Sequence, residues 1–153
     1  YSGTVTAAME AAIWGLPGVA ISLDSPAKRH GELDYAPAAS IARRIVKQVI
    51  AHGLPKGILL NVNVPYLPEE QINELRITRQ GLRVYHDRLD ERKDPRGRPY
   101  YWIGGDAPTG IPEAGTDIGA LAEGAVSITP LCLDLTAYLV APELKDWGWN
   151  DLH

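Results

Sequence analysis

The sequence predicts an α/β protein, in which helices cover the faces of a parallel sheet. Three observations support this expectation. Over residues 1–65, helical and strand-like patterns alternate. The short strand patterns contain few polar residues, as in strands that are covered on both faces. Their spacing suits right-handed crossovers between parallel strands.

Apolar spacing and glycine or proline positions locate the elements of this first part. The predicted elements are, in order, a helix over 3–15, a strand over 19–23, a helix over 36–52 and a strand over 58–64. The first helix contains many alanines, so it can lie close to a sheet. Pro37 is tolerated in the first turn of the second helix, and Gly53 is placed to end that helix.

The pattern becomes β-rich after Pro65. Strands are expected over 75–80, 82–89 and 100–103, with no helical period between them. The last two strands are predicted to form a long hairpin whose turn lies within 93–97. There Pro95 presets the first central position and Gly97 takes the fourth, as a type I turn prefers. Because the hairpin is highly charged, we expect it to project from the body as an arm.

The remaining residues complete the expected domain. They are a Gly/Pro-rich stretch over 104–115, a short helix over 117–123, a strand over 126–129 ending at Pro130, and a last helix capped by Asp134 or Thr136. The whole prediction is one domain over 1–153, with an α/β layer over 1–65 and a β-rich arm and C-terminal segment over 66–153. The expected fold is a three-layer α/β/α Rossmann-like sheet, incomplete in this chain, with a projecting β-hairpin arm and a C-terminal helix.

Composition narrows the possible partners. The 153 residues are 45% hydrophobic and carry a net charge of −4, with 15 basic and 19 acidic residues. This mixture gives no basic stripe for a nucleic acid duplex. No apolar run approaches the roughly 20 residues that span a bilayer, so no membrane partner is expected. The single Cys132 fits a reducing compartment, and we expect a cytoplasmic protein.

The best local candidate for chemistry is Ser2-Gly3-Thr4, at the start of the first predicted helix. Free backbone N–H groups there converge with two hydroxyl groups and the positive end of the helix dipole, which suits a bound anion. Gly3 allows a phosphate to approach the backbone. The alternative is that Ser2 or Thr4 is an ordinary helix cap, which Ser and Thr commonly are.

Other polar positions carry weaker signals. Asn61 and Asn63 alternate with valines and so face one way, either as a buried pair that holds neighbouring loops or as ligand contacts. Arg79 could reach a phosphate or lie exposed at a strand end. The basic trio Lys28-Arg29-His30 follows a parallel strand, where α/β sheets bind ligands, although solvated loop charge is the alternative. The four histidines show no metal-ligand spacing.

Several short motifs together resemble one known family. They occur in the order Tyr1-Ser2-Gly3-Thr4-Val5, Ala20-Ile21-Ser22, Asn61-Val62-Asn63-Val64-Pro65, Thr78-Arg79-Gln80, Asp94-Pro95-Arg96-Gly97-Arg98-Pro99-Tyr100-Tyr101-Trp102, Gly115-Thr116-Asp117 and Val126-Ser127-Ile128-Thr129-Pro130-Leu131. Each motif is short, but this ordered set is similar to that of SurE-type (survival protein E) proteins and covers nearly the whole chain.

The resemblance implies a phosphomonoesterase that acts on nucleoside 5′- and 3′-monophosphates with a divalent metal, Mg²⁺ or Mn²⁺. It also implies a cytoplasmic dimer or tetramer in which the hairpin arm and the C-terminal segment are exchanged between subunits. Family members begin with a strand ending in an Asn-Asp-Asp-Gly motif that binds the metal, and this chain has no such motif. We therefore expect the metal ligands upstream of Tyr1 and assign no catalytic or metal residue in this chain. By the resemblance, Ser2, Gly3 and Thr4 are phosphate-binding residues.

Two functional hypotheses remain open at this point. In the first, the chain is part of a SurE-like nucleotidase that lacks the metal-binding part. In the second, it is a non-catalytic oligomerisation or anion-binding module. A first helix that covers one side of a sheet and leaves an apolar face exposed would favour the first hypothesis.

Overall fold

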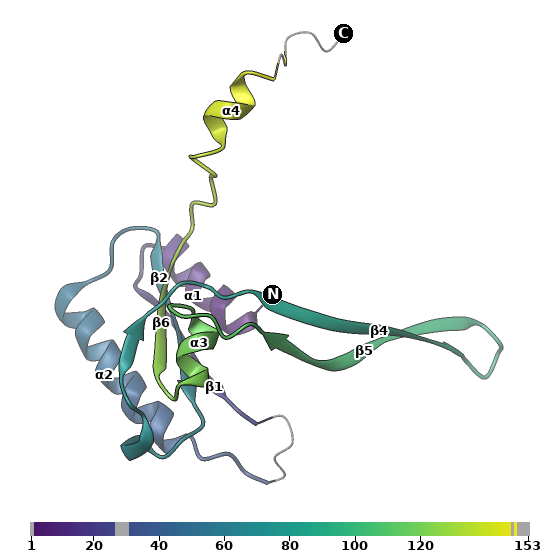
Figure 1. Cartoon of the computed structure of the whole chain (residues 1–153), viewed down its shortest axis with the longest axis horizontal. Helices are drawn as coiled ribbons and strands as arrows, with labels where there is room; N and C mark the ends of the chain where they lie inside the picture. The colour runs from purple at the N-terminus through teal and green to yellow at the C-terminus, as the bar shows by residue number, and fades with distance from the viewer. Residues whose placement is uncertain (1, 27–30, 148, 150–153) are drawn as a thin grey trace.

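A computed structural model describes residues 2–26, 31–147 and 149 of the chain. Its elements are α1 (Gly3–Ile13), β1 (Gly18–Asp24), α2 (Ala36–His52), β2 (Ile58–Pro65), a 3₁₀ turn η1 (Glu69–Gln71), β3 (Leu75–Ile77), β4 (Arg83–Lys93), β5 (Pro99–Gly110), α3 (Asp117–Ala122), β6 (Val126–Cys132) and α4 (Ala141–Lys145). Figure 1 shows a body of sheet and helices from which the β4–β5 hairpin and the α4 segment extend in different directions. The predicted α/β class, projecting arm and C-terminal helix are confirmed.

The body contains a four-stranded sheet in the order β1-β2-β6-β3. β1 and β2 are parallel over their whole length, from the pair Gly18 and Leu59 to the pair Asp24 and Pro65. β6 runs antiparallel to β2, and β3 runs parallel to β6. The sheet is therefore mixed, and β1 forms one of its edges.

One face of the sheet packs against α2. Ile41, Ile45 and Val49 recur at helical spacing on α2 and are buried against Val62 and Val64 of β2. Gly53 ends the helix with a positive φ of 73°, a conformation that glycine adopts without steric cost. The predicted helix over 36–52 is confirmed at both ends.

The opposite face packs against α1, which gives the three predicted layers. Ala8 and Ala12 of α1 are buried against Ala20 and Leu59 of the sheet. The two backbones lie so close that a Cβ atom added at Gly18 would stand 2.2 Å from the carbonyl oxygen of Ala8. Small residues on both sides of this contact therefore set the position of α1.

The arm confirms the predicted turn and corrects the extent of its second strand. The carbonyl oxygen of Asp94 accepts the N–H of Gly97 at 2.9 Å, and its carboxylate accepts the N–H groups of Arg96 and Arg98. The pairing of β4 with β5 continues to the pair Arg83 and Gly110. The predicted strands over 82–89 and 100–103 were therefore too short, since β4 continues to Lys93 and β5 to Gly110. Strand pairing needs only backbone groups, which the Gly-rich stretch also supplies.

Two C-terminal boundaries also differ from the prediction. β6 does not end at Pro130 but continues to Cys132. Pro130 has no backbone N–H to donate to a neighbouring strand. It is tolerated because β3 pairs with β6 only over 126–128, so no described strand beside Pro130 needs that hydrogen bond. The last helix is capped neither by Asp134 nor by Thr136, since it begins at Ala141.

The carboxylate of Asp134 instead closes a turn in the segment that leads to α4. It accepts hydrogen bonds from Thr136 and from the hydroxyl of Tyr138, and these bonds lower its pKa to about 2. Within the described part of the chain, no helix is both long and apolar enough to span a bilayer.

Candidate anion-binding site

The first candidate group, Ser2-Gly3-Thr4, lies at the N-terminus of α1. Ser2 has an extended backbone and is the helix cap: its Oγ accepts the N–H of Val5 at 3.4 Å, and its carbonyl oxygen accepts the N–H and the hydroxyl of Thr6. The capping role is thus present. Capping satisfies the amides of Val5 and Thr6 but leaves those of Gly3 and Thr4, which have no partner inside the helix.

The surroundings of this first turn favour an anion. Ser2, Gly3 and Thr4 are all exposed, and the first turn contains no acidic side chain that would offset the positive end of the helix dipole. A Cβ atom added at Gly3 would meet nothing within 4 Å, and Gly3 has no positive φ. Neither packing nor backbone geometry within the described chain therefore requires glycine at this position.

The N-terminus of α1 is directed toward the carboxyl edge of the parallel strands. α1 leads into β1 through a short turn and packs along β1 with Ala8 beside Gly18, so the two elements run in opposite directions (Figure 1). The N-terminus of α1 therefore points toward the edge where β1 ends. Open α/β sheets bind their ligands at this edge.

Polar side chains form a row on the same face of the sheet. Ser22, Asn63 and Ser127 are aligned across β1, β2 and β6. Because alternate residues share a face, Asn63 points to the same side as Leu59, which packs on α1. The amide nitrogen of Asn63 donates to Oγ of Ser127 at 3.3 Å. Asn63 thus holds β2 to β6.

The next row toward the opposite edge contains Asn61, which is half-buried, and Thr129. The hydroxyl groups of Thr129 and Thr78 share a buried hydrogen bond of 2.7 Å. This face of the sheet therefore changes from apolar, where α1 packs, to polar near the carboxyl edge. A ligand contact of either asparagine remains a prediction.

Among the described contacts, Arg79 does not contact the α1 terminus. Arg79 forms an ion pair of 2.8 Å with Glu113, and both side chains are exposed. Its backbone pairs with Gly115 and Asp117. Arg79 thus contacts the loop before α3. The trio Lys28-Arg29-His30 lies outside the described residues.

No group of three His, Cys, Asp or Glu side chains that could hold a metal ion occurs in the described part of the chain. The fold and this site together define a class: a three-layer α/β protein with an anion-compatible helix terminus that points toward the carboxyl edge of its parallel strands. Comparison with known proteins then gives the family.

A sequence model described as "Survival protein SurE" matches residues 1–87. The chain belongs to the SurE family. Relatives named "5′-nucleotidase SurE" include one from Chloroflexus aggregans, 46% identical over 150 residues, and one from Herpetosiphon aurantiacus, 48% identical over 151 residues. These matches cover 98% and 99% of this chain and 58% of each relative. This chain therefore spans little more than half of their length.

A solved structure confirms the likeness of the fold. The crystal structure of the SurE protein from Aquifex aeolicus is similar with a TM-score of 0.72 and 41% sequence identity. The match covers 95% of this chain and 57% of that protein.

Proposed function

We propose that the chain is the phosphate-holding part of a phosphatase that hydrolyses nucleoside 5′- and 3′-monophosphates. The observation that carries this proposal is the open first turn of α1, where the amides of Gly3 and Thr4 can bind a phosphate oxygen. The names of the relatives support a nucleotide as the phosphate ester. Ser2, Gly3 and Thr4 are the proposed phosphate-binding residues.

The residues of this site do not themselves suit the divalent metal that we expect, Mg²⁺ or Mn²⁺. Such cations require clustered oxygen ligands, mainly carboxylates, and the first turn of α1 has no acidic side chain. The positive end of the helix dipole also disfavours a cation. We propose that the metal ligands lie in a part of the longer relatives that this chain does not span. A cytoplasmic location, suggested by the single exposed Cys132, is part of the same proposal.

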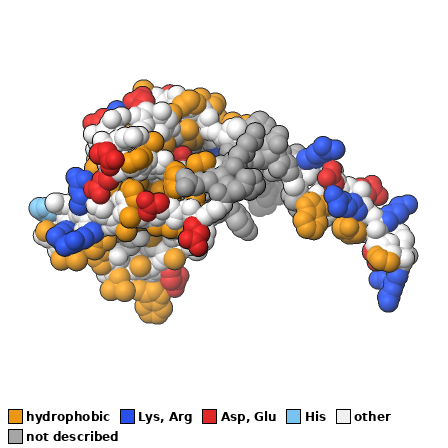
Figure 2. Space-filling model, turned by 90° about the horizontal axis from the view of Figure 1, so that it is seen from below, with side chains coloured by type: hydrophobic (Ala, Val, Ile, Leu, Met, Phe, Trp, Pro, Cys, Tyr) orange, Lys and Arg blue, Asp and Glu red, His pale blue; other side chains and the backbone are white. Residues whose placement is uncertain are grey.

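The arm supports a further part of the proposal, a homo-oligomer. The exposed fractions of Tyr100, Tyr101 and Trp102 are 43%, 56% and 60%. Figure 2 shows hydrophobic side chains beside basic and acidic ones along the arm, away from the body. Isolated two-stranded ribbons are marginal in water, so a second subunit that covers these rings would stabilise the arm. We propose a dimer or tetramer that assembles through it.

The same exposed rings favour the second candidate function, a non-catalytic oligomerisation module. The edge of the sheet distinguishes between the two candidate functions. β1 is an edge strand with no partner on its outer side among the described residues, and its Val19, Ile21 and Leu23 are only half-buried. An apolar parallel strand is usually covered and paired on both sides. This open edge favours the nucleotidase, whose longer relatives can add a strand there.

Replacing Gly3 with valine is expected to weaken the binding of inorganic phosphate about tenfold or more. A branched side chain would block the approach to the amides of Gly3 and Thr4, and a hydrogen bond to a charged group is worth about 1.5–3 kcal/mol. The free energy of unfolding should change by less than about 1 kcal/mol, because the added atoms meet nothing. Amide chemical shifts of residues 3–5 during a phosphate titration measure the affinity.

The matched control is Ala7→Val, which puts the same side chain on an exposed position of the same helix. This control should bind phosphate as the unmodified chain does. Equal phosphate affinity in the Gly3→Val variant would leave Ser2-Gly3-Thr4 with a capping role only.

A further inference from the structure

The root of the arm is interlocked with the start of α3. Gly81 lies shortly before β4, and Gly110 is the last residue of β5. A Cβ atom added at Gly110 would stand 2.3 Å from Cδ1 of Ile118, and one added at Gly81 would stand 2.9 Å from the same atom. The side chain of Ile118 therefore contacts both root segments of the arm. Figure 1 shows α3 beside the end of β5, where the arm meets the body.

The close approach of Ile118 explains the two glycines. Neither Gly81 nor Gly110 has a positive φ, so a left-handed backbone does not require glycine at these positions. A larger residue at Gly110 would instead displace Ile118, because three atoms of that side chain would lie 3.0 Å or less from the new Cβ. Each glycine thus leaves room for one side chain of α3.

Hydrogen bonds tie the same segments together. Oδ1 of Asp117 accepts the N–H of Gly81 at 2.8 Å and the N–H of Ile118 at 2.9 Å. The carbonyl oxygen of Arg79 accepts the N–H of Asp117 at 3.0 Å, and the N–H of Arg79 donates to the carbonyl oxygen of Gly115 at 3.0 Å. One carboxylate oxygen thus holds the arm side to the helix side. We refer to Gly81, Gly110, Asp117 and Ile118 as the arm joint.

The helix that carries half of the arm joint is fixed in the body. Thr116 is fully buried and caps α3, since its Oγ1 accepts the N–H of Gly119 at 3.0 Å and donates to the carbonyl oxygen of Glu113 at 2.6 Å. Gly119 and Ala120 are buried, and α3 contacts β6 and β2 of the sheet. A contact between the arm and Ile118 therefore connects the arm to the core of the body.

Beyond the arm joint, the arm extends away from the body as two strands (Figure 1). These strands pair with each other from Arg83 and Gly110 to Lys93 and Pro99. Pairing within the ribbon fixes the two strands relative to each other, but it does not fix their direction relative to the sheet. That direction depends on the contacts at the root.

We propose that the arm joint holds the arm in one direction relative to the sheet. Ile118 keeps the two root segments in place by packing against both, and the Asp117 carboxylate keeps the arm side from separating from α3. The arm is then presented to a partner in a preoriented form, so less conformational entropy is lost when the partner binds. The proposal concerns a single chain. It goes beyond the proposed function and does not depend on nucleotide hydrolysis.

Two spin labels measure the direction of the arm. One is attached at Arg96→Cys in the distal turn, where the backbone N–H bonds to Asp94, and the other at Lys47→Cys on the exposed face of α2. Both are placed in a Cys132→Ser background, and labelled chain is mixed with an excess of unlabelled chain, so that distances within one chain dominate. Pulsed electron-spin resonance should give a single narrow distance peak. A broad distribution would overturn the proposal without any substitution in the arm joint.

Variants of the arm joint locate the effect. Ile118→Ala removes the side chain that contacts both glycines, and Asp117→Ala removes the oxygen that accepts the N–H of Gly81. The narrow peak should be lost in both variants, and Asp117→Asn, which retains an oxygen acceptor, should restore it. Ile111→Ala is the matched control, because it removes the same atoms from an exposed residue at the root of the arm. A narrow peak in both Ile118→Ala and Asp117→Ala, in protein that unfolds cooperatively in urea, would contradict the proposal.

The outcome is separable from the proposed homo-oligomer, because light scattering of the same samples reports on assembly. A monomer with a narrow peak would remove the homo-oligomer from the account and leave the arm joint standing. An oligomer whose peak stays narrow in both Ile118→Ala and Asp117→Ala would show that the partner subunit directs the arm, which would overturn the role of the arm joint.

Discussion

Removing the distal arm is expected to lower the mass of the homo-oligomer that we propose. Arg88 and Gly104 are paired across β4 and β5, so a short Asn-Gly turn can join them directly and replace residues 89–103. The deletion removes Leu89 and the three exposed aromatic residues 100–102. By two-fold symmetry each such contact would be made twice, so its loss should release subunits completely. Light scattering measures the mass.

The matched control for this deletion is Arg96→Ser, which changes the charge of the distal turn and retains every aromatic side chain. This variant should keep the original mass, since Asp94 holds the turn through backbone N–H groups of residues 96 and 98. An unchanged mass for the deletion variant, in protein whose circular dichroism and thermal unfolding remain cooperative, would show that the arm does not hold the subunits together.

Replacing Gly18 with alanine is expected to destabilise the body by about 1–3 kcal/mol or more. The new Cβ atom would stand 2.2 Å from the carbonyl oxygen of Ala8 and 3.3 Å from the Cβ of Leu59. Because the first contact is with backbone, α1 must move away from β1 as a unit, and overpacking in a closed contact has this cost. Phosphate binding should weaken too, since the α1 terminus moves. Urea unfolding gives the stability.

Gly3→Ala serves as the control, because it adds the same methyl group at the other end of the contact region, where nothing lies within 4 Å. Its free energy of unfolding should differ from that of the unmodified chain by less than about 1 kcal/mol. A Gly18→Ala variant as stable as this control would contradict the close packing of α1 on β1.

The elements with strong periodicity could be predicted from the sequence. Ile41, Ile45 and Val49 define one face of α2, and that face is the one buried. The parallel pair β1 and β2 followed from two short apolar runs separated by a helix. The course of β5 through Gly104 and Gly105 was missed, because glycine has no side chain to show a strand period. The end of β6 was missed because Pro130 can lie inside a strand only where no neighbouring strand needs its N–H. That condition depends on where β3 stops, which the sequence does not show.

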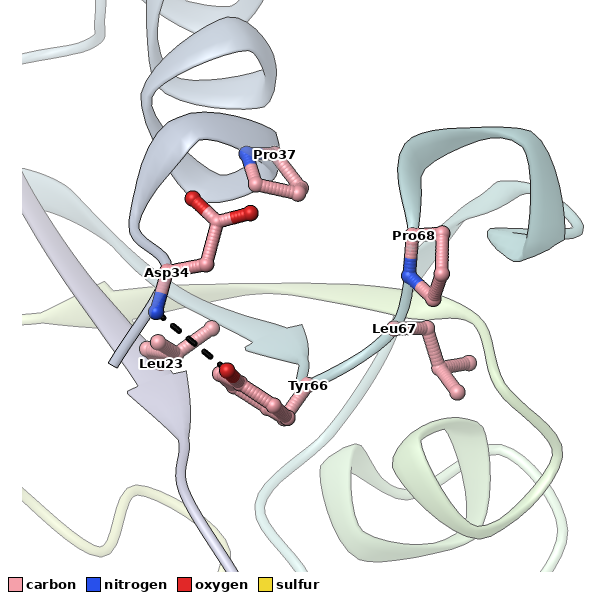
Figure 3. Close-up of a pocket in the computed structure, with 6 residues that line it drawn as sticks. All are labelled: Leu23, Asp34, Pro37, Tyr66, Leu67 and Pro68. Carbon is pink, nitrogen blue, oxygen red and sulfur yellow. Dashed lines mark hydrogen bonds between the residues drawn. The ribbon is translucent and has the colours of Figure 1, made fainter. Parts of the chain in front are cut away.

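Some of the polar residues near the sheet edge could likewise be predicted from the sequence, and others could not. Ser2, Gly3 and Thr4 are consecutive, so a local motif revealed the helix terminus and its open amides. Asp34 and Tyr66 share a hydrogen bond (Figure 3) only because the chain returns to the same edge of the sheet, and neither residue belongs to a motif. Their position directly beside predicted element ends, one before a helix and one after a strand, is the signal that could have drawn attention to them. The antiparallel return of β6, which places Ser127 beside Asn63, is a long-range feature that spacing does not show.

Metal-dependent release of phosphate from adenosine 5′-monophosphate tests the central claim most directly. Two proteins are compared with Mg²⁺ or Mn²⁺. One is the 153-residue chain, and the other is the same chain joined upstream of Tyr1, where we expect the metal ligands, to the part of the Chloroflexus aggregans relative that this chain does not span. We expect no release above background from the chain and chelator-sensitive release from the extended protein, because the first turn of α1, where we propose the phosphate contacts, has no acidic side chain to bind the metal. Chelator-sensitive turnover by the 153-residue chain alone, or a folded extended protein without turnover, would contradict the account.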